Sequence, residues 1–252
     1  EEVTDLRWDG RRWHLRTASG IVDEGDVVIA ATGVLHHPSY PDIDGLGDFA
    51  GTTMHTARWD ESLPLAGRRV GIIGTGSSAI QTVPTIVDEV AHLSLFQRTA
   101  QWVMPAENPA YTEEEKAAFR ADPGLLHTLH AEISELFSNG FSDAVVDADS
   151  EGMRRIEEAC RANLEGNVHD LDLRERLRPD YRAGCKRLVV SPNFYDGIQR
   201  PNAELVTEPI DRIEAGGVRT ADGHLHELDV LVLATGFRVD RFLRPIEVAG
   251  AD

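Results

Sequence analysis

The chain has few cysteines, no long apolar segment and a deficit of positive charge. Its only cysteines, Cys160 and Cys185, are far apart and form no C-x-x-C pair. This excludes a redox-active disulfide and a structural zinc site, and it fits a reducing cytosol. No apolar run is long enough to cross a bilayer, and no signal peptide or lipidation motif is visible. We therefore expect a cytoplasmic protein without a membrane or a metal.

The charge balance limits the partners of the chain. A formal net charge of −18 on 252 residues repels nucleic-acid phosphates, so we expect no nucleic acid partner. An anionic cofactor is not excluded, because a local pocket can be positive on an acidic protein. The length allows one large core or two modest ones, and 41% hydrophobic residues is ordinary for a soluble globular protein.

Two segments of the chain resemble each other. Asp26–Gly33 and Asp229–Gly236 both begin with Asp, continue as an apolar run and end in Ala-Thr-Gly. Such runs are typical of parallel strands buried on both faces, and the closing glycine lets the backbone approach a ligand. A chance similarity of two buried strands is the alternative. The repeat predicts that four residues contribute to cofactor sites: Thr32, Gly33, Thr235 and Gly236.

Each of these runs follows a predicted antiparallel meander. Residues 3–25 and 210–228 contain short strand-like pieces separated by glycine turns. A meander followed by such a strand resembles the closing half of a nucleotide-binding domain in two-dinucleotide flavoproteins. The chain therefore has two closing halves but one opening half, and we expect the second opening half to precede Glu1.

The opening half is a glycine loop in the expected context. Arg69–Ile73 is predicted as a strand, and Ser77–Val90 as a helix with Pro84 as an irregularity. Between them the G-x-G-x-x-A motif provides a tight turn, a close approach for a pyrophosphate and close helix packing. The predicted cofactor-binding residues here are Gly74, Thr75, Gly76, Ser77, Ser78, Ala79 and Gln81.

The next predicted strand, His92–Phe96, indicates which nucleotide binds. It ends in Gln97-Arg98-Thr99 rather than in the Asp or Glu typical of an NAD site. A guanidinium suits a 2′-phosphate, so Arg98 and Thr99 predict NADP(H). The alternative for Arg98 is a solvated surface charge.

Residues 105–183 carry helical patterns and precede a basic pair. A capping box at Thr112–Glu115 predicts a helix start, and helical patterns follow over 125–137 and 152–164. The segment Gly184–Leu188 then contains Lys186 and Arg187 in a predicted loop. A solvated surface pair is the more common role of such charges.

Residues 49–60 match F-x-G-x-x-x-H-x-x-x-W-[P/D] through Phe49, Gly51, His55, Trp59 and Asp60. This motif ahead of a second glycine loop resembles the fingerprint of the type I Baeyer–Villiger monooxygenases, within the flavin-containing monooxygenase superfamily. The basic pair, in the same chain order, is similar to the active-site loop of that family. We call residues 49–60 the fingerprint segment and residues 184–188 the basic loop.

The resemblance implies an α/β fold with two dinucleotide-binding domains. The chain would hold a complete Rossmann-like NADP domain with a helical insertion, and the C-terminal half of an FAD domain. The expected parts are 1–48 for the partial FAD domain, 49–62 for the linker, 63–236 for the NADP domain with its insertion at about 105–183, and 237–252 for a return segment.

The resemblance also implies the reaction and the residue roles. FAD and NADPH would serve a monooxygenase that inserts one oxygen of O2 beside a ketone carbonyl, through a C4a-peroxyflavin, to give an ester or lactone. Arg187 would be catalytic, Lys186 would support Arg98 on the 2′-phosphate, and His55 and Trp59 would be conformational. Two alternatives stay open: a flavin monooxygenase acting on nitrogen or sulfur centres, and an NADP-binding module without catalysis of its own.

Overall fold

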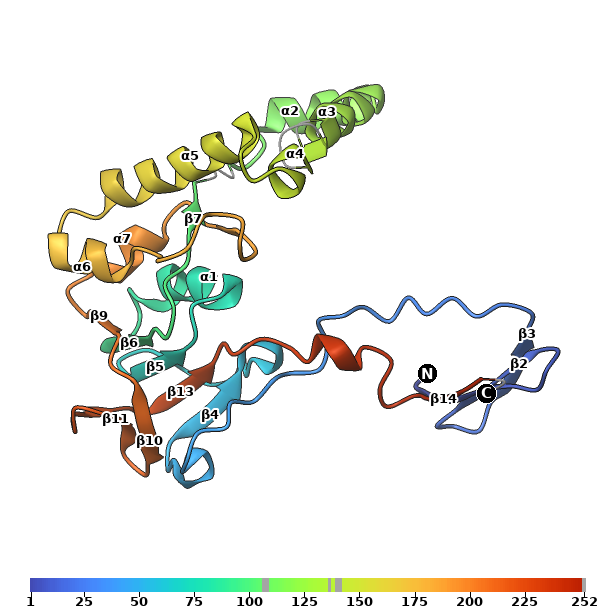
Figure 1. Cartoon of the computed structure of the whole chain (residues 1–252), viewed down its shortest axis with the longest axis horizontal. Helices are drawn as coiled ribbons and strands as arrows, with labels where there is room; N and C mark the ends of the chain where they lie inside the picture. The colour runs from blue at the N-terminus through green and yellow to red at the C-terminus, as the bar shows by residue number, and fades with distance from the viewer. Residues whose placement is uncertain (106–108, 136, 139–141, 251–252) are drawn as a thin grey trace. The chain divides into compact units, whose positions relative to one another are not determined.

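The computed structural model describes residues 1–105, 109–135, 137–138 and 142–250 (Figure 1). The chain divides into two compact units, one of Glu1–Pro41 with Thr235–Asp252 and the other of Asp42–Ala234. We describe each unit by itself. In the described part of the chain, no helix combines the length and the apolarity that crossing a membrane requires.

The larger unit is built on a five-stranded parallel sheet. Its strand order is β4-β13-β5-β6-β9. The strands are β4 (Thr52–His55), β13 (Val230–Leu233), β5 (Arg69–Ile73), β6 (His92–Phe96) and β9 (Ala203–Val206). The predicted strands at 69–73 and 92–96 are confirmed with these bounds. The apolar run after Asp229 is confirmed as β13, an interior strand between β4 and β5.

Strand β13 is buried because both its faces are covered. Its four residues are each 0% exposed, and their side chains alternate between two separate core clusters. Val230 and Val232 pack with residues of the helices α1 (Ser77–Ile86) and α7 (Phe194–Ile198). Leu231 and Leu233 pack with the small sheet described next.

That small sheet is the predicted second meander. It consists of β10 (Ile210–Glu214), β11 (Gly217–Thr220) and β12 (Leu225–Glu227), paired antiparallel in that order. Its apolar side chains Ile213 and Val218 join the cluster on the second face of the large sheet. The meander therefore covers the face opposite α1.

The helix after β5 is shorter than predicted. The pattern over 77–90 predicts one helix, whereas α1 ends at Ile86 and Val87 caps it. Pro84 lies inside α1 and packs against α7, because a Cβ added to Gly197 would lie 3.0 Å from the Pro84 Cα. Ala79, Ile80 and Val83 bury the inner face of α1 against the sheet.

The segment between β6 and β9 carries further helices. Their bounds are α2 (Glu113–Ala121), α3 (Gly124–Glu135), α4 (Ser142–Val146), α5 (Glu151–Asn167) and α6 (Leu171–Arg176). The short strands β7 (Val103–Met104) and β8 (Val189–Val190) pair in parallel.

The capping box predicted at the start of α2 is confirmed. The Thr112 N–H donates to Glu115 Oε2 at 2.7 Å, and the Glu115 N–H donates to Thr112 Oγ1 at 3.2 Å. The helix α5, the longest of those with bounds given above in the described residues, buries Met153, Ile156 and Cys160 along one face. Their spacing of three and four residues gives the apolar stripe of a packed helix.

The smaller unit contains the first predicted meander. The strands β1 (Val3–Trp8), β2 (Trp13–Thr17) and β3 (Val22–Gly25) pair antiparallel, and β14 (Glu247–Ala249) pairs in parallel with β1. The prediction of a buried strand over 26–33 is wrong. Val27 is 76% exposed and Ile29 is 86% exposed, because no described strand pairs with this segment and a parallel strand needs neighbours on both sides.

One ion pair joins the beginnings of β13 and β5. Asp229 Oδ2 accepts from the Arg69 N–H at 2.8 Å, and Asp229 Oδ1 accepts from Arg69 Nη2 at 2.8 Å. These hydrogen bonds from Arg69 lower the pKa of the Asp229 carboxyl. The residues are 160 positions apart in sequence, so the pair fixes the register of two strands that are distant along the chain.

We predict that Asp229→Asn lowers the free energy of unfolding by about 1 kcal/mol at neutral pH, a modest value because the pair is more than a third exposed. Because the folded pKa is depressed, the contribution is present above the unfolded value of about 4 and is lost as the pH falls through the folded pKa. Urea unfolding of both proteins between neutral pH and about pH 3 measures this. Glu227→Gln, on a side chain 68% exposed, is the control. A difference that stays constant with pH would contradict the prediction.

Candidate functional site

The carboxyl ends of the parallel strands meet at one edge of the large sheet. Strand pairing places Leu233 beside both His55 and Ile73, and Ile73 beside Phe96. The glycine loop, the segment after β6 and the last part of the fingerprint segment (56–60) all emerge here. In open α/β sheets, ligands bind at this edge.

Gly74 makes the turn that opens the glycine loop. Its φ is +111°, and a Cβ there would lie 2.5 Å from the Ala234 carbonyl oxygen. Both the left-handed backbone and the close approach of β13 therefore require glycine. The Gly74 N–H donates to the Phe96 carbonyl oxygen at 3.2 Å, which joins the loop to the end of β6.

The start of α1 fits an anionic group. Gly76 is the N-cap residue and provides no side-chain cap, and no atom lies within 4 Å of where its Cβ would be. The first-turn residues Ser77, Ser78 and Ala79 follow it. An uncapped helix start has free N–H groups and the positive end of the helix dipole. The space above Gly76 would admit a pyrophosphate that a side chain would exclude.

Thr75 connects the glycine loop to the segment that contains Arg98. The side chain is 7% exposed, and its hydroxyl donates to the Thr99 carbonyl oxygen at 2.7 Å. On the other side of Arg98, Gln97 Nε2 donates to the Arg176 carbonyl oxygen at 2.6 Å. Both neighbours of Arg98 are thus held, while the Arg98 side chain itself is exposed.

The basic loop lies against the same segment. The Tyr181 hydroxyl donates to the Ala100 carbonyl oxygen at 3.0 Å, two residues beyond Arg98. Lys186 Nζ lies 4.5 Å from the centroid of the Tyr181 ring, within the range of a cation–π interaction. The structure therefore brings Lys186 toward the Arg98 segment. Arg187 is exposed and forms no ion pair with any residue in the described ranges.

The fingerprint segment belongs to the edge strand β4 and its flanks. Phe49 is buried in the cluster on the meander face. Gly51 has no room for a side chain, because a Cβ there would lie 2.4 Å from the Asp229 carbonyl oxygen and 2.6 Å from the Phe49 ring. These two residues therefore shape the packing of β4 against β13.

The remaining fingerprint residues follow at the carboxyl end of β4. His55 is 2% exposed, and its Nδ1 accepts from the Ala57 N–H at 3.1 Å, which caps a short 3-10 turn. Asp60 Oδ1 accepts from the Ser62 hydroxyl at 2.6 Å, and this bond lowers the pKa of the Asp60 carboxyl. His55 and Asp60 therefore both stabilise local turns.

Trp59 and Gln81 face a shared groove. It has a volume of about 670 Å³ and runs between the segment after His55 and the outer face of α1. Ser78 also lines it, so two predicted cofactor-binding residues of α1 share this groove with a fingerprint residue. Thr82 and Thr85 line it too, and their spacing from Ser78 along α1 is the signal that identifies this polar face.

The four residues of the repeat lie in the smaller unit. Thr32 Oγ1 donates to the Phe242 carbonyl oxygen at 2.9 Å, and Thr235 Oγ1 donates to the Ser39 carbonyl oxygen at 2.5 Å. Gly33 and Gly236 both have positive φ, at 74° and 81°. The backbone similarity thus holds at both closing glycines, although only one of the preceding runs is a strand.

Tyr181 and Arg182 make contacts in this region that no sequence pattern predicted. Tyr181 and Arg182 immediately precede Ala183 and the basic loop, and their contacts lie about eighty and twenty-five residues away in sequence. The sequence feature that could have drawn attention to them is an aromatic residue and an arginine shortly before the basic pair. The partners themselves cannot be identified without the tertiary structure.

Comparisons with known proteins place the chain among monooxygenases. No protein-family model matches the chain. It is 46% identical over 252 residues to an uncharacterized monooxygenase of Mycobacterium tuberculosis, covering 99% of this chain and 50% of the relative. It is 39% identical over 256 residues to a Baeyer-Villiger monooxygenase of Streptomyces coelicolor, covering 100% of this chain and 48% of the relative. The chain thus spans about half the length of these curated relatives.

Solved structures agree with this. The open crystal structure of cyclohexanone monooxygenase superimposes with a TM-score of 0.84 at 32% identity, covering 100% of this chain and 56% of that one. OTEMO in complex with FAD and NADP gives a TM-score of 0.83 at 27% identity, covering 100% and 55%. The α/β fold expected from the sequence is confirmed.

We predict that Thr75→Val destabilises the protein by about 1–2 kcal/mol, because it leaves the Thr99 carbonyl oxygen without its partner. The change should also weaken NADP+ binding, because the Arg98 segment loses its tie to the glycine loop. Thermal unfolding and calorimetric titration measure the two effects. Thr75→Ser keeps the hydroxyl and serves as the control. If valine and serine behaved alike, the hydrogen bond would not carry this role.

Proposed function

The chain belongs to the type I Baeyer–Villiger monooxygenase family, and we propose that it functions in FAD- and NADPH-dependent monooxygenation. The reaction inserts one oxygen atom of O2 next to a ketone carbonyl and gives an ester or a lactone. The substrates are a small ketone and O2. The two cysteines, neither of them in a disulfide, support the prediction that the protein works in the cytoplasm.

The observation that carries the proposal is the arrangement around the glycine loop. Gly76 leaves an open, uncapped helix start, and Thr75 ties that loop to the segment of Arg98. We assign the pyrophosphate of NADP(H) to the first turn of α1 and the 2′-phosphate to Arg98. Thr99 and Lys186 would support this phosphate from the two segments that Tyr181 joins.

When bound, NADPH supplies a hydride and FAD supplies the chemistry that activates O2. The residues of this chain contribute binding and charge. We assign Arg187 the catalytic role, because an exposed guanidinium without an ion pair among the described residues can stabilise negative charge that develops on the substrate oxygen. His55 and Trp59 would hold the chain in place at the carboxyl edge of the large sheet, where the cofactor binds, rather than exchange protons.

The smaller unit supports a role beside FAD. Gly33 and Gly236 each provide a left-handed closing glycine, next to Thr32 and Thr235, and we propose that these four residues approach the flavin nucleotide. The FAD pyrophosphate would need a second glycine loop between a strand and a helix. The string G-x-G-x-x-A also occurs at 45–50, but there it leads into a short 3-10 turn, whereas among the described residues only 74–79 places this motif between a strand and an α-helix. We therefore propose that 1–48 and 237–252 contribute part of an FAD domain, with 49–62 as the connection to an NADP domain over 63–236. Within these ranges, β4 of the connection pairs with β13 in the sheet of the larger unit, and Thr235 and Gly236 at the end of the NADP range belong to the smaller unit.

Product analysis tests the reaction. The protein, supplied with FAD and NADPH, is offered a cyclic ketone and, separately, a thioether. We expect the lactone to dominate. Sulfoxide without lactone would favour the alternative of a flavin monooxygenase that oxidises nitrogen or sulfur. NADP+ binding without flavin retention or NADPH oxidation would favour a binding module without catalysis.

We predict that Arg98→Ala weakens NADP+ binding by about 2–3 kcal/mol, the value of a charged hydrogen bond, and leaves NAD+ binding nearly unchanged. Calorimetric titration with both dinucleotides measures this. The control is Arg200→Ala, since Arg200 is exposed and pairs with Asp88 at 3.3 Å. Equal losses for NADP+ and NAD+ would separate Arg98 from the 2′-phosphate.

A further inference from the structure

The segment that enters the basic loop is attached to two different parts of the larger unit. We propose that Arg182 is a positioning residue, which sets Lys186 and Arg187 in place by pairing with Glu157 of α5. Tyr181, its neighbour in sequence, attaches the same segment to the residues after β6. The inference rests on the proposed function, because it assigns a purpose to the placement of the two basic residues.

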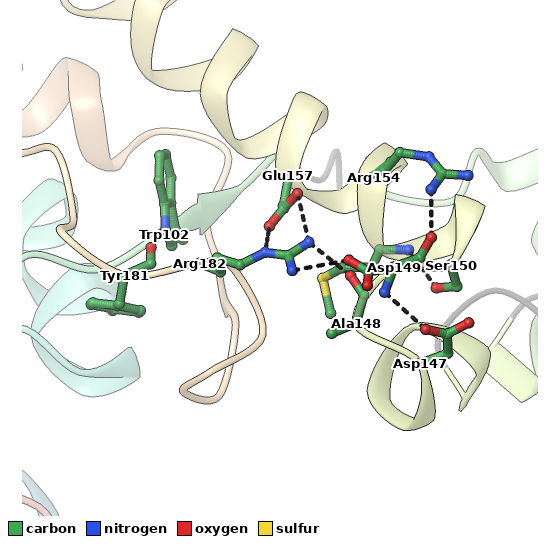
Figure 2. A network of polar contacts seen from close by, with 10 residues as sticks. Trp102, Asp147, Ala148, Asp149, Ser150, Arg154, Glu157, Tyr181 and Arg182 are labelled. Carbon is green, nitrogen blue, oxygen red and sulfur yellow. Dashed lines mark hydrogen bonds and ion pairs between the residues drawn. The ribbon is translucent and has the colours of Figure 1, made fainter.

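Arg182 forms a bidentate ion pair. Its Nε donates to Glu157 Oε1 at 2.6 Å and its Nη2 lies 3.3 Å from Glu157 Oε2. The same Nη2 donates to the Ala148 carbonyl oxygen at 2.7 Å, and Nη1 lies 3.4 Å from Asp149 Oδ1. Figure 2 shows the guanidinium directed at Glu157 and at the turn before α5. A planar fork with this many partners holds one orientation.

The turn that receives Arg182 is itself ordered. The Asp149 N–H donates to Asp147 Oδ1 at 2.9 Å (Figure 2). The Met153 N–H donates to Ser150 Oγ at 3.1 Å, which caps the start of α5. The hydrogen bond from Arg182 also lowers the pKa of the Glu157 carboxyl, the direction expected when a guanidinium stabilises a carboxylate. The turn that Arg182 contacts therefore has internal hydrogen bonds of its own.

The chain immediately after Arg182 continues this attachment. Ala183 is 2% exposed and packs in a cluster with Met153, Ile156 and Cys160 of α5. Gly184 has a φ of +86°, and a Cβ there would lie 2.8 Å from the Met153 Cε. From Arg182 to Gly184 the chain thus follows α5, and Lys186 is two residues further on.

The opposite attachment runs through Tyr181. Trp102 Nε1 donates to the Tyr181 carbonyl oxygen at 2.6 Å (Figure 2), and the Tyr181 hydroxyl donates to the Ala100 carbonyl oxygen at 3.0 Å. The Tyr181 ring also lies under Lys186 Nζ. The helical insertion and the segment after β6 therefore hold the entry to the basic loop between them.

This arrangement separates the roles of three cations. Glu157 neutralises Arg182, whereas Lys186 and Arg187 are exposed and have no ion pair with a described residue. Binding a phosphate costs less when the groups that meet it are already ordered. Arg182 supplies that order instead of contacting the ligand.

Two substitutions on opposite sides of the ion pair test the proposal. We expect Arg182→Ala and Glu157→Gln each to weaken NADP+ binding about two- to fivefold, the range of a half-exposed ion pair, with NAD+ binding unchanged. Glu157→Gln is decisive because removing a negative charge would strengthen phosphate binding by simple electrostatics. The control is Arg178→Ala, since Arg178 pairs with Glu165 and Glu175 but not with the turn before α5.

A second measurement reports on the loop without a cofactor. Cys185 is exposed and Cys160 is 0% exposed, so a nitroxide spin label attached to the native protein reports from the basic loop. We expect a more mobile spectrum for Arg182→Ala and for Glu157→Gln, and an unchanged spectrum for Arg178→Ala. Thermal midpoints close to that of the unchanged protein would show that the variants are folded.

The outcomes separate the inference from the proposed function. Unchanged label mobility in both variants, or tighter NADP+ binding by Glu157→Gln, would overturn the role of Arg182. If the protein without substitutions bound NADP+ and NAD+ equally well, the assignment of the 2′-phosphate to Arg98 would be wrong. The basic loop would then have no phosphate to bind. Greater mobility together with a selective loss of NADP+ affinity would support both.

Discussion

The interior strand β13 is the constraint on which the other parts of the larger unit depend. It is the last strand of that unit in sequence, yet it lies between β4 and β5 and is buried on both faces. Its backbone approaches both neighbours closely: the Asp229 carbonyl excludes a side chain at Gly51, and the Ala234 carbonyl excludes one at Gly74. The same strand therefore requires glycine at position 51 of the fingerprint segment and at position 74 of the glycine loop.

The position of β13 also accounts for which segments meet at the candidate site. Parallel pairing in one register places the ends of β4, β5 and β6 at a common edge, and each end continues into a segment with a different task. The glycine loop provides N–H groups, the segment after β6 provides Arg98, and the end of β4 provides buried His55. A shift of one residue in β13 would reverse which of its side chains face α1. The fold and the candidate site are thus determined by one register.

Local patterns predicted much of this fold, and tertiary contacts decided the rest. The strand, glycine loop and helix start at 69–79 could be predicted because turn chemistry and periodicity agree there. The run at 26–33 is apolar like the one at 229–236 and shares its first Asp and its closing Ala-Thr-Gly, but only the second has described strands on both sides. An apolar composition shows that a segment could form a buried strand. Whether it does so depends on neighbouring strands that pair with it. Arg182 and Glu157 show the same limit, because nothing in their sequence spacing of twenty-five residues indicates a contact.

An acidic chain that binds an anionic dinucleotide must overcome its own charge locally. A net charge of −18 repels phosphates at long range, but salt screens this repulsion over about 8–10 Å. In the proposed site, the positive groups within that distance would be the uncapped start of α1, Arg98 and the basic loop. Since a pair such as Arg182 with Glu157 is neutral as a whole, it adds order without adding charge. Selectivity for a phosphate in such a protein therefore depends on where the few unpaired cations are held rather than on how many the chain contains.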